Sequence, residues 1–293
     1  DRSSRIMILI GIILALGPAL APTIGGLMLP VFGWQSIFLL MTVIGFLVIW
    51  VALFSMKETV TADPSRLNFK ALGRTYKALL SNPQFLSAAL VMGGALGALY
   101  AQATFLPFIL MDEVGLTPAQ FGASMLAQSG SFFTASLLVR QLMGQFSADR
   151  LVGPGLVFVA LGSLGTLTLL LWPPSFLHVM VPVATYSFGI AFVMPAMSTA
   201  ALAPFGRAAG AAASMLGFIQ MGSGLLVGSL GALMGNALLA MATLIPMMGA
   251  VACVSFLVYR KIQPRLAAAA PADTRATCGP KVTAPSPVSA PEK

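Results

Sequence analysis

The chain has 293 residues, of which 58% are hydrophobic and only 8% are charged, and its formal net charge is +8. A soluble globular domain carries about 25% charged residues. The composition therefore excludes an ordinary soluble protein and predicts an all-α integral membrane protein.

Eight stretches of the chain are long and apolar enough to span a bilayer, which needs about 20 apolar residues. They are residues 6–29, 34–55, 84–111, 119–144, 151–172, 177–204, 208–233 and 235–259. The longest polar connection separates the first two spans from the other six. We therefore expect two groups of transmembrane helices joined by a linker.

This grouping predicts four regions. Residues 1–55 hold two helices, residues 56–83 form a linker with an amphipathic helix, and residues 84–260 form a six-helix bundle. Residues 261–293 are rich in Ala and Pro with scattered charge. Such a composition cannot bury a core, so we expect a disordered tail there.

The positions of the basic residues predict the orientation. All sixteen Lys and Arg fall before the first span, at the end of the fourth span or after an even-numbered one, whereas the opposite side holds only Asp112, Glu113 and His178. Because cytoplasmic loops carry the excess of Lys and Arg, both ends of the chain and the linker are expected in the cytoplasm. The positive charge then reflects membrane topology, and no nucleic-acid partner is expected.

The first span contains an unusual run of helix breakers, GPALAPTIGG, from Gly17 to Gly26. An interior Pro costs a helix in water about 3 kcal/mol, but in a bilayer the backbone has no alternative to a helix. Small residues at four-residue spacing let another helix approach closely, and prolines bend the helix that carries them. The segment predicts a helix for close contact or motion, although static membrane bundles use the same pattern.

Two later spans begin with recognisable capping signals. Asn82 and Pro83 place a cap residue before a proline at the first helical position. Thr117 and Gln120 have the spacing of a capping box. Both pairs predict helix starts at the membrane boundary.

Polar and adaptable side chains inside spans are candidates for a substrate cavity, because each is costly unless it faces a cavity or a partner. The residues that we select are Tyr100, Gln102, Gln128, Tyr186, Met194 and Gln220. Such a lining is suited to varied apolar ligands. The competing interpretation is that polar groups bond back to their own helix and that Met fills the core.

Signals of enzyme chemistry are absent from the sequence. No HExxH, nucleophile elbow or phosphate loop occurs, and Cys253 and Cys278 lack the neighbours of a metal site. No Asp, Glu or His lies deep in any of the eight spans. We expect no enzyme activity, no metal and no cofactor.

The Gly17–Gly26 segment resembles the fifth-helix antiporter motif of the major facilitator superfamily, G-x-x-x-G-P-x-x-G-G, with Ala21 in place of the middle Gly. The motif positions are Gly17, Pro18, Ala21, Pro22, Gly25 and Gly26. Together with FGWQSIF at residues 32–38, it is similar to drug:proton antiporters of the bicyclomycin and chloramphenicol resistance (Bcr/CflA) type. Residues 107–122 and 210–220 support the same resemblance.

The resemblance implies a twelve-helix transporter of which this chain matches helices 5 to 12. Residues 1–55 then correspond to the last two helices of the N-terminal bundle, and residues 84–260 to the C-terminal bundle. It implies a chain truncated at its N-terminus, with the proton-coupling acid in the missing helices. Residues 140–150 are similar to a degenerate cytoplasmic loop motif, with Arg140, Asp149 and Arg150 as a cytoplasmic gate; alternatively, Arg140 extends from its helix end to the interface.

These expectations combine into proton-coupled efflux of amphipathic, drug-like molecules across the bacterial inner membrane by alternating access. The proton gradient would supply the energy, and the partners would be the bilayer, the substrate and protons. One alternative is a carrier of a small metabolite, which would need a specific charged binding site. The other is a remnant that does not transport.

Overall fold

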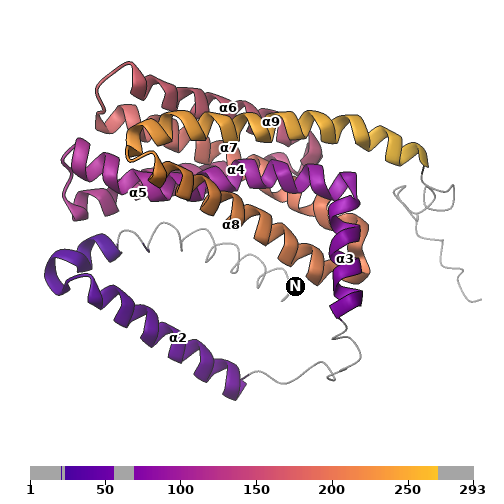
Figure 1. Cartoon of the computed structure of the whole chain (residues 1–293), viewed down its shortest axis with the longest axis horizontal. Coiled ribbons are helices and arrows are strands. Elements are labelled where there is room, and N and C mark those ends of the chain that lie inside the picture. The colour runs from indigo at the N-terminus through magenta and orange to yellow at the C-terminus, as the bar shows by residue number, and fades with distance from the viewer. Residues whose placement is uncertain (1–20, 22–23, 56–68, 270–293) are drawn as a thin grey trace, which may run out of the picture.

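The computed structural model of the protein describes residues 21, 24–55 and 69–269, and in this part of the chain the secondary structure is helical throughout (Figure 1). One helix covers residues 24–32. The labelled helices that follow are α2 (Gln35–Ser55), α3 (Phe69–Ser81), α4 (Pro83–Pro107), η2 (Phe108–Glu113), α5 (Pro118–Leu142), α6 (Ala148–Leu167), η3 (Thr168–Leu170), α7 (Phe176–Leu202), η4 (Ala203–Ala208), α8 (Ala209–Leu233) and α9 (Ala237–Ala269).

The predicted caps set the starts of two helices. The Asn82 side chain accepts hydrogen bonds from the backbone N–H groups of Gln84 and Phe85, both at 3.0 Å, and Pro83 begins α4. At α5 the Thr117 hydroxyl accepts from the Gln120 backbone, and the Gln120 side chain accepts from the Thr117 backbone. Each cap satisfies donors that a helix start leaves unpaired, and both predictions are confirmed.

Helices α4 to α9 form one bundle, with α4 in contact with α7, α8 and α9, and with α7 also packed against α5 and α6 (Figure 1). Large apolar side chains such as Phe85, Leu106, Ile190 and Met241 are fully buried between these helices. The bundle agrees with the six-helix group expected for residues 84–260.

Glycines let the backbones of α6 and α7 approach each other. A Cβ atom on Gly162 would lie 2.6 Å from the backbone nitrogen of Tyr186. On the facing helix, a Cβ atom on Gly189 would lie 2.5 Å from the carbonyl oxygen of Gly155. Close packing of this kind is how small residues hold membrane helices together.

Six helices in the described ranges are long and apolar enough to cross a membrane. They are Gln35–Ser55, Pro83–Glu113, Ala148–Leu170, Phe176–Gly206, Ala209–Leu233 and Ala237–Gln263. A seventh predicted span, 119–144, forms helix α5, but α5 carries three Gln and one Arg and is less apolar. Most of the first predicted span, 6–29, lies outside the described residues.

Helix α2 lies apart from the bundle (Figure 1). None of its residues is buried, and large apolar side chains such as Phe46, Trp50 and Leu53 are exposed around it. A helix that is apolar on every side matches a lipid environment.

Helix α3 lies across one end of the bundle, where it contacts α4 and α8 (Figure 1). Leu79 is fully buried against the bundle, while Arg74 and Lys77 on the same helix are exposed. This two-sided arrangement, across the end of the bundle, is what an amphipathic surface helix in the linker would show. The rest of the predicted linker, residues 56–68, and the tail beyond residue 269 lie outside the described part.

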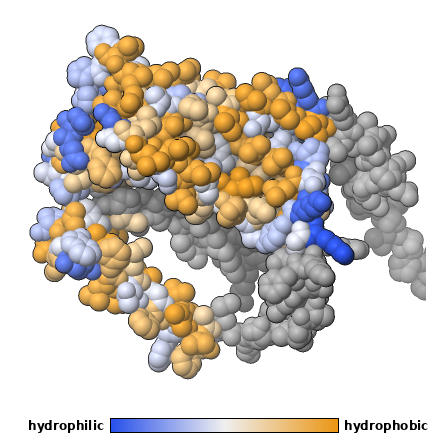
Figure 2. Space-filling model, in the orientation of Figure 1, coloured by the Kyte–Doolittle hydropathy of each residue, from blue (hydrophilic) through white to orange (hydrophobic). Residues whose placement is uncertain are grey.

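Figure 2 shows apolar side chains covering the length of the bundle, with hydrophilic side chains gathered towards its two ends. The end that holds α3 is also where α5 ends, α6 begins and α9 ends, so Arg140, Arg150 and Arg260 belong to it. Asp112 and Glu113, at the close of η2, belong to the opposite end. Charge is thus separated along the bundle as the sequence predicts.

Candidate substrate site

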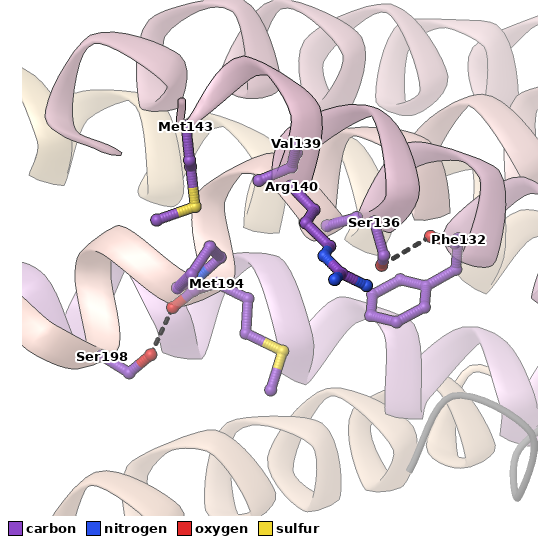
Figure 3. A pocket seen from close by; sticks show the side chains of 9 residues that line it. Phe132, Ser136, Val139, Arg140, Met143, Met194 and Ser198 are labelled. Atoms are coloured by element: carbon purple, nitrogen blue, oxygen red, sulfur yellow. Dashed lines mark hydrogen bonds between the residues drawn. The ribbon is translucent and has the colours of Figure 1, made fainter. Parts of the chain in front are cut away.

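A cleft of about 420 Å³ lies between α5 and α7 (Figure 3). We call it the α5–α7 cleft. Its lining is Phe132, Ser136, Val139, Arg140 and Met143 from α5 and its C-terminal end, and Ala191, Met194, Pro195 and Ser198 from α7. This volume falls within the range of small-molecule sites, about 300–1,000 Å³.

Helical periodicity places the lining residues of α5 on one face of that helix and those of α7 on one face of the other. The α5 residues 132, 136, 139, 140 and 143 recur at intervals of one, three or four, as do the α7 residues 191, 194, 195 and 198. Residues three and four apart lie on the same face of a helix. Pro195 has no backbone N–H. The Ala191 carbonyl, four residues earlier, therefore lacks its usual helical hydrogen bond beside the cleft.

The two serine hydroxyl groups of the cleft both donate hydrogen bonds to backbone carbonyl oxygens. Ser136 Oγ donates to the Phe132 carbonyl at 2.8 Å, and Ser198 Oγ donates to the Met194 carbonyl. Each oxygen keeps lone pairs and can still accept a hydrogen bond from a ligand. The remaining surface of the cleft is largely apolar.

Among the described residues, Arg140 is the one charged side chain that lines the cleft. It belongs to the last turn of α5, where a cation interacts favourably with the helix dipole. Figure 3 shows its side chain extending back along α5 towards Phe132. None of the described residues that line the cleft is a carboxylate, so the guanidinium can bind an anionic group or donate to a hydrogen-bond acceptor there.

Of the six residues predicted to line a substrate cavity, Met194 alone lines this cleft, and its side chain is 41% exposed. Tyr100 is exposed on α4 and packs close to Gly224 of α8. Gln128 on α5 and Gln220 on α8 are half-buried. The predicted lining is thus distributed over four helices, and it shares one residue with the α5–α7 cleft.

Two of the predicted cavity residues lie in the packed interior instead. Tyr186 is fully buried, and its hydroxyl donates to the carbonyl oxygens of Gly94 at 3.1 Å and Ala95 at 3.0 Å. Gln102 is also fully buried, and neither its amide nitrogen nor its amide oxygen has a hydrogen-bond partner. The expectation that they face a cavity is not met, because both side chains point between packed helices.

The three residues predicted as a cytoplasmic gate do not lie together. Arg140 lines the α5–α7 cleft, whereas Asp149 and Arg150 line a second pocket of about 340 Å³ between α6 and α9. Both sites belong to the same end of the bundle, but they are formed by different helix pairs. The three residues thus line two separate pockets, and their role as a cytoplasmic gate stays a prediction.

The described part of the antiporter motif contacts α5. Gly26 is buried, and a Cβ atom on it would lie 2.6 Å from the Pro118 carbonyl oxygen. For Gly25 the nearest atom, Ile37 Cδ1, is 3.9 Å from the corresponding position, and Ala21 is exposed. The motif residues Gly17, Pro18 and Pro22 lie outside the described residues.

The family to which this chain belongs follows from its match to a family model. The model of the Major Facilitator Superfamily matches residues 1–232 of this chain. The chain belongs to the Major Facilitator Superfamily. This membership and the six membrane-length helices in the described ranges agree with the expectation of an all-α membrane protein.

Curated relatives of the superfamily match most of this chain. An uncharacterized MFS-type transporter, YdgK of Bacillus subtilis (strain 168), is 25% identical over 232 residues, or 78% of this chain and 57% of the relative. Multidrug resistance protein MdtL of Escherichia coli O157:H7 and of Shigella dysenteriae serotype 1 is 29% identical over 224 residues, or 75% of this chain and 54% of the relative. The chain thus spans about half the length of these relatives.

The cleft residues other than Met194 and Arg140 were not selected from the sequence of this superfamily member. A usable signal was present, because Arg140 is the only charged residue in the predicted span 119–144. Residues 132, 136 and 143 lie on its helical face at intervals of three or four. Following that face from the single charge would have found the α5 wall.

Proposed function

We propose that this protein exports amphipathic, drug-like molecules across the bacterial inner membrane, and that it is of the Bcr/CflA type. The observation that carries the proposal is the α5–α7 cleft, which has the volume of a drug site and a mainly apolar lining. The motif at Gly25 and Gly26 and the similarity to proteins named for multidrug resistance support it.

The side chains of the cleft suit loose recognition. Met143 and Met194 are flexible and polarizable, and Phe132 offers a flat apolar surface. Such side chains repack around ligands of different shape. Ser136 and Ser198 add hydrogen-bond acceptors that do not demand one fixed partner.

We further propose that export runs by alternating access and draws on the proton gradient, without a bound cofactor. The contact of Gly26 with the start of α5 supports a helix pair that seals one side in one state. Among the described residues, no acidic side chain lines the cleft, and Asp112 and Glu113 belong to the far end of the bundle. Under this proposal, none of the described residues that line the cleft is the coupling acid.

Expression in a drug-sensitive bacterial host tests the proposal. The chain is expressed alone, and also joined to the residues encoded immediately upstream of Asp1. Resistance that a protonophore abolishes is the expected result. Resistance that persists after the gradient has collapsed would contradict proton coupling, and no resistance in either form would contradict drug export.

One observation favours a second candidate function, the transport of a small organic anion. Arg140 supplies the charged group that a specific metabolite carrier needs, in a cleft without a compensating carboxylate. Uptake of one organic anion, independent of the proton gradient and without drug resistance, would support this carrier. A phenotype that requires the upstream residues would show that the chain alone does not transport.

A further inference from the structure

We propose that the pocket between α6 and α9 binds the headgroup phosphate of an anionic phospholipid. We call it the α6–α9 pocket. It has a volume of about 340 Å³ and is lined by Asp149, Arg150, Gly153, Phe256, Tyr259, Arg260 and Gln263. This site is separate from the α5–α7 cleft and does not depend on what the protein transports.

The pocket lies where two apolar spans end. Asp149, Arg150 and Gly153 belong to the first two turns of α6, whose span begins at Ala148. The residues from α9 occupy the last turns of the span that ends at Gln263. The pocket is therefore at the level where phospholipid headgroups meet the hydrocarbon.

Two aromatic residues of α9 line the pocket. Phe256 and Tyr259 are both largely buried, and their rings stack with centroids 6.2 Å apart. The Tyr259 hydroxyl accepts a bond from Gln263 Nε2 at 3.4 Å, so its own proton can be donated. A tyrosine hydroxyl facing the polar side and a ring facing the apolar side is the usual arrangement at a membrane interface.

The charge of the pocket favours an anion. Arg150 and Arg260 contribute two positive charges, and the neighbouring Lys261 is exposed beside them. Among the described lining residues Asp149 is the only acidic one, and it belongs to the first turn of α6, where a negative charge complements the helix dipole. Two guanidinium groups remain for a phosphate, which they bind well in bidentate geometry.

The backbone at the start of α6 adds donors. Ser147 is the N-cap of α6, but its side chain makes no capping hydrogen bond. The Arg150 N–H donates to the Ser147 carbonyl at 3.0 Å, so the N–H groups of Ala148 and Asp149 are the ones that the start of this helix can offer to a phosphate.

An apolar track leads from the pocket along both helices, and this favours a lipid over free phosphate. On α6 the exposed Val157 and Leu161 continue the stripe that begins at Gly153. On α9 the exposed Leu257 and Val254 lie one and two turns before Arg260. Figure 1 shows α6 and α9 on the side of the bundle away from α2, where acyl chains can lie against them. Basic pockets between membrane helices on the cytoplasmic side commonly bind such headgroups.

Native mass spectrometry of the purified full chain with added phosphatidylglycerol tests this proposal. The double variant Arg150→Gln/Arg260→Gln is expected to weaken lipid binding by about 30-fold, given about 1 kcal/mol for each basic residue. The matched control Arg74→Gln/Lys77→Gln removes the same charge from the exposed face of α3 and is expected to leave binding unchanged. Equal weakening in both doubles would mean general surface attraction and would overturn the site.

A steric variant keeps the charges in place. A Cβ atom on Gly153 would meet no other atom within 4 Å, so Gly153→Leu is expected to fold and to block the pocket. Unchanged lipid binding by this variant would overturn the proposal. Inorganic phosphate, tested as a competitor, is expected not to displace phosphatidylglycerol, and displacement would assign the site to free phosphate instead.

Discussion

Gly26 packs directly on the backbone at the start of α5, so that a Cβ atom at this position would lie 2.6 Å from the carbonyl oxygen of Pro118. Real Cβ atoms do not come so close to an oxygen. The helix that carries the antiporter motif can therefore meet α5 in this arrangement only with glycine at residue 26. The neighbouring Gly25 meets nothing closer than Ile37 Cδ1 at 3.9 Å.

This difference predicts opposite results for two adjacent substitutions. Gly26→Ala forces the two helices apart, at a cost of about 1–3 kcal/mol, and we expect drug export to fall strongly while the protein still reaches the membrane. Gly25→Ala has room for its methyl group and is expected to export normally. Resistance and membrane abundance are measured for both, and equal export by the two variants would contradict the contact.

The close contact between α6 and α7 predicts that two Gly→Ala variants on α6 differ in stability. Gly162→Ala places a methyl group 2.6 Å from the Tyr186 backbone nitrogen, and we expect it to lower the free energy of unfolding by about 1–3 kcal/mol. Gly153→Ala on the same helix meets no atom within 4 Å and is the control. Thermal unfolding in detergent distinguishes them, and the same midpoint for both would argue against close packing there.

We predict that replacing Gln102 by an apolar residue stabilises the protein. Its buried amide has no partner, and an unsatisfied buried polar group costs about 1–3 kcal/mol. Gln102→Leu is therefore expected to raise the unfolding midpoint without changing drug export, while Gln128→Leu, at a half-buried site, has a smaller effect. A loss of export by Gln102→Leu at unchanged stability would restore the cavity role that the sequence predicts.

We predict that replacing Arg140 changes the preference of the protein for anionic over neutral compounds. Arg140→Gln removes the only charge among the described residues of the α5–α7 cleft, and charge-assisted hydrogen bonds contribute about 1.5–3 kcal/mol. We expect transport of anionic test compounds to fall by at least about tenfold, with neutral compounds unaffected. Arg74→Gln on α3 is the control, and equal losses for anionic and neutral compounds would mean that Arg140 has only a structural role.

The sequence was sufficient to predict most of the helices and the starts of two of them. Hydropathy locates a span because lipid imposes the same requirement on every residue in it, and the caps at Asn82 and Thr117 depend on residues within one turn. Both signals are local. The separation of basic and acidic residues between the two ends of the bundle could also be predicted, because it depends only on where each loop lies between spans.

The faces of the helices were much harder to predict. Tyr186 and Gln102 are polar, yet they are buried because α4 and α7 pack at those positions, and Tyr186 finds its acceptors on residues 91 and 92 positions away in the chain. Arg140 and Arg150 are ten residues apart but line different sites. Such outcomes depend on how helices distant in sequence meet, which composition and spacing do not encode.

The central claim, that drug-like molecules pass through the α5–α7 cleft, is tested most directly by filling that cleft. The measurement is efflux of a neutral fluorescent dye from cells that express Met194→Trp, compared with Leu177→Trp, an exposed site on the same helix. We expect Met194→Trp to lower efflux by about tenfold, equivalent to about 1.4 kcal/mol, and Leu177→Trp to match the unaltered protein. Unchanged efflux by Met194→Trp would contradict the claim.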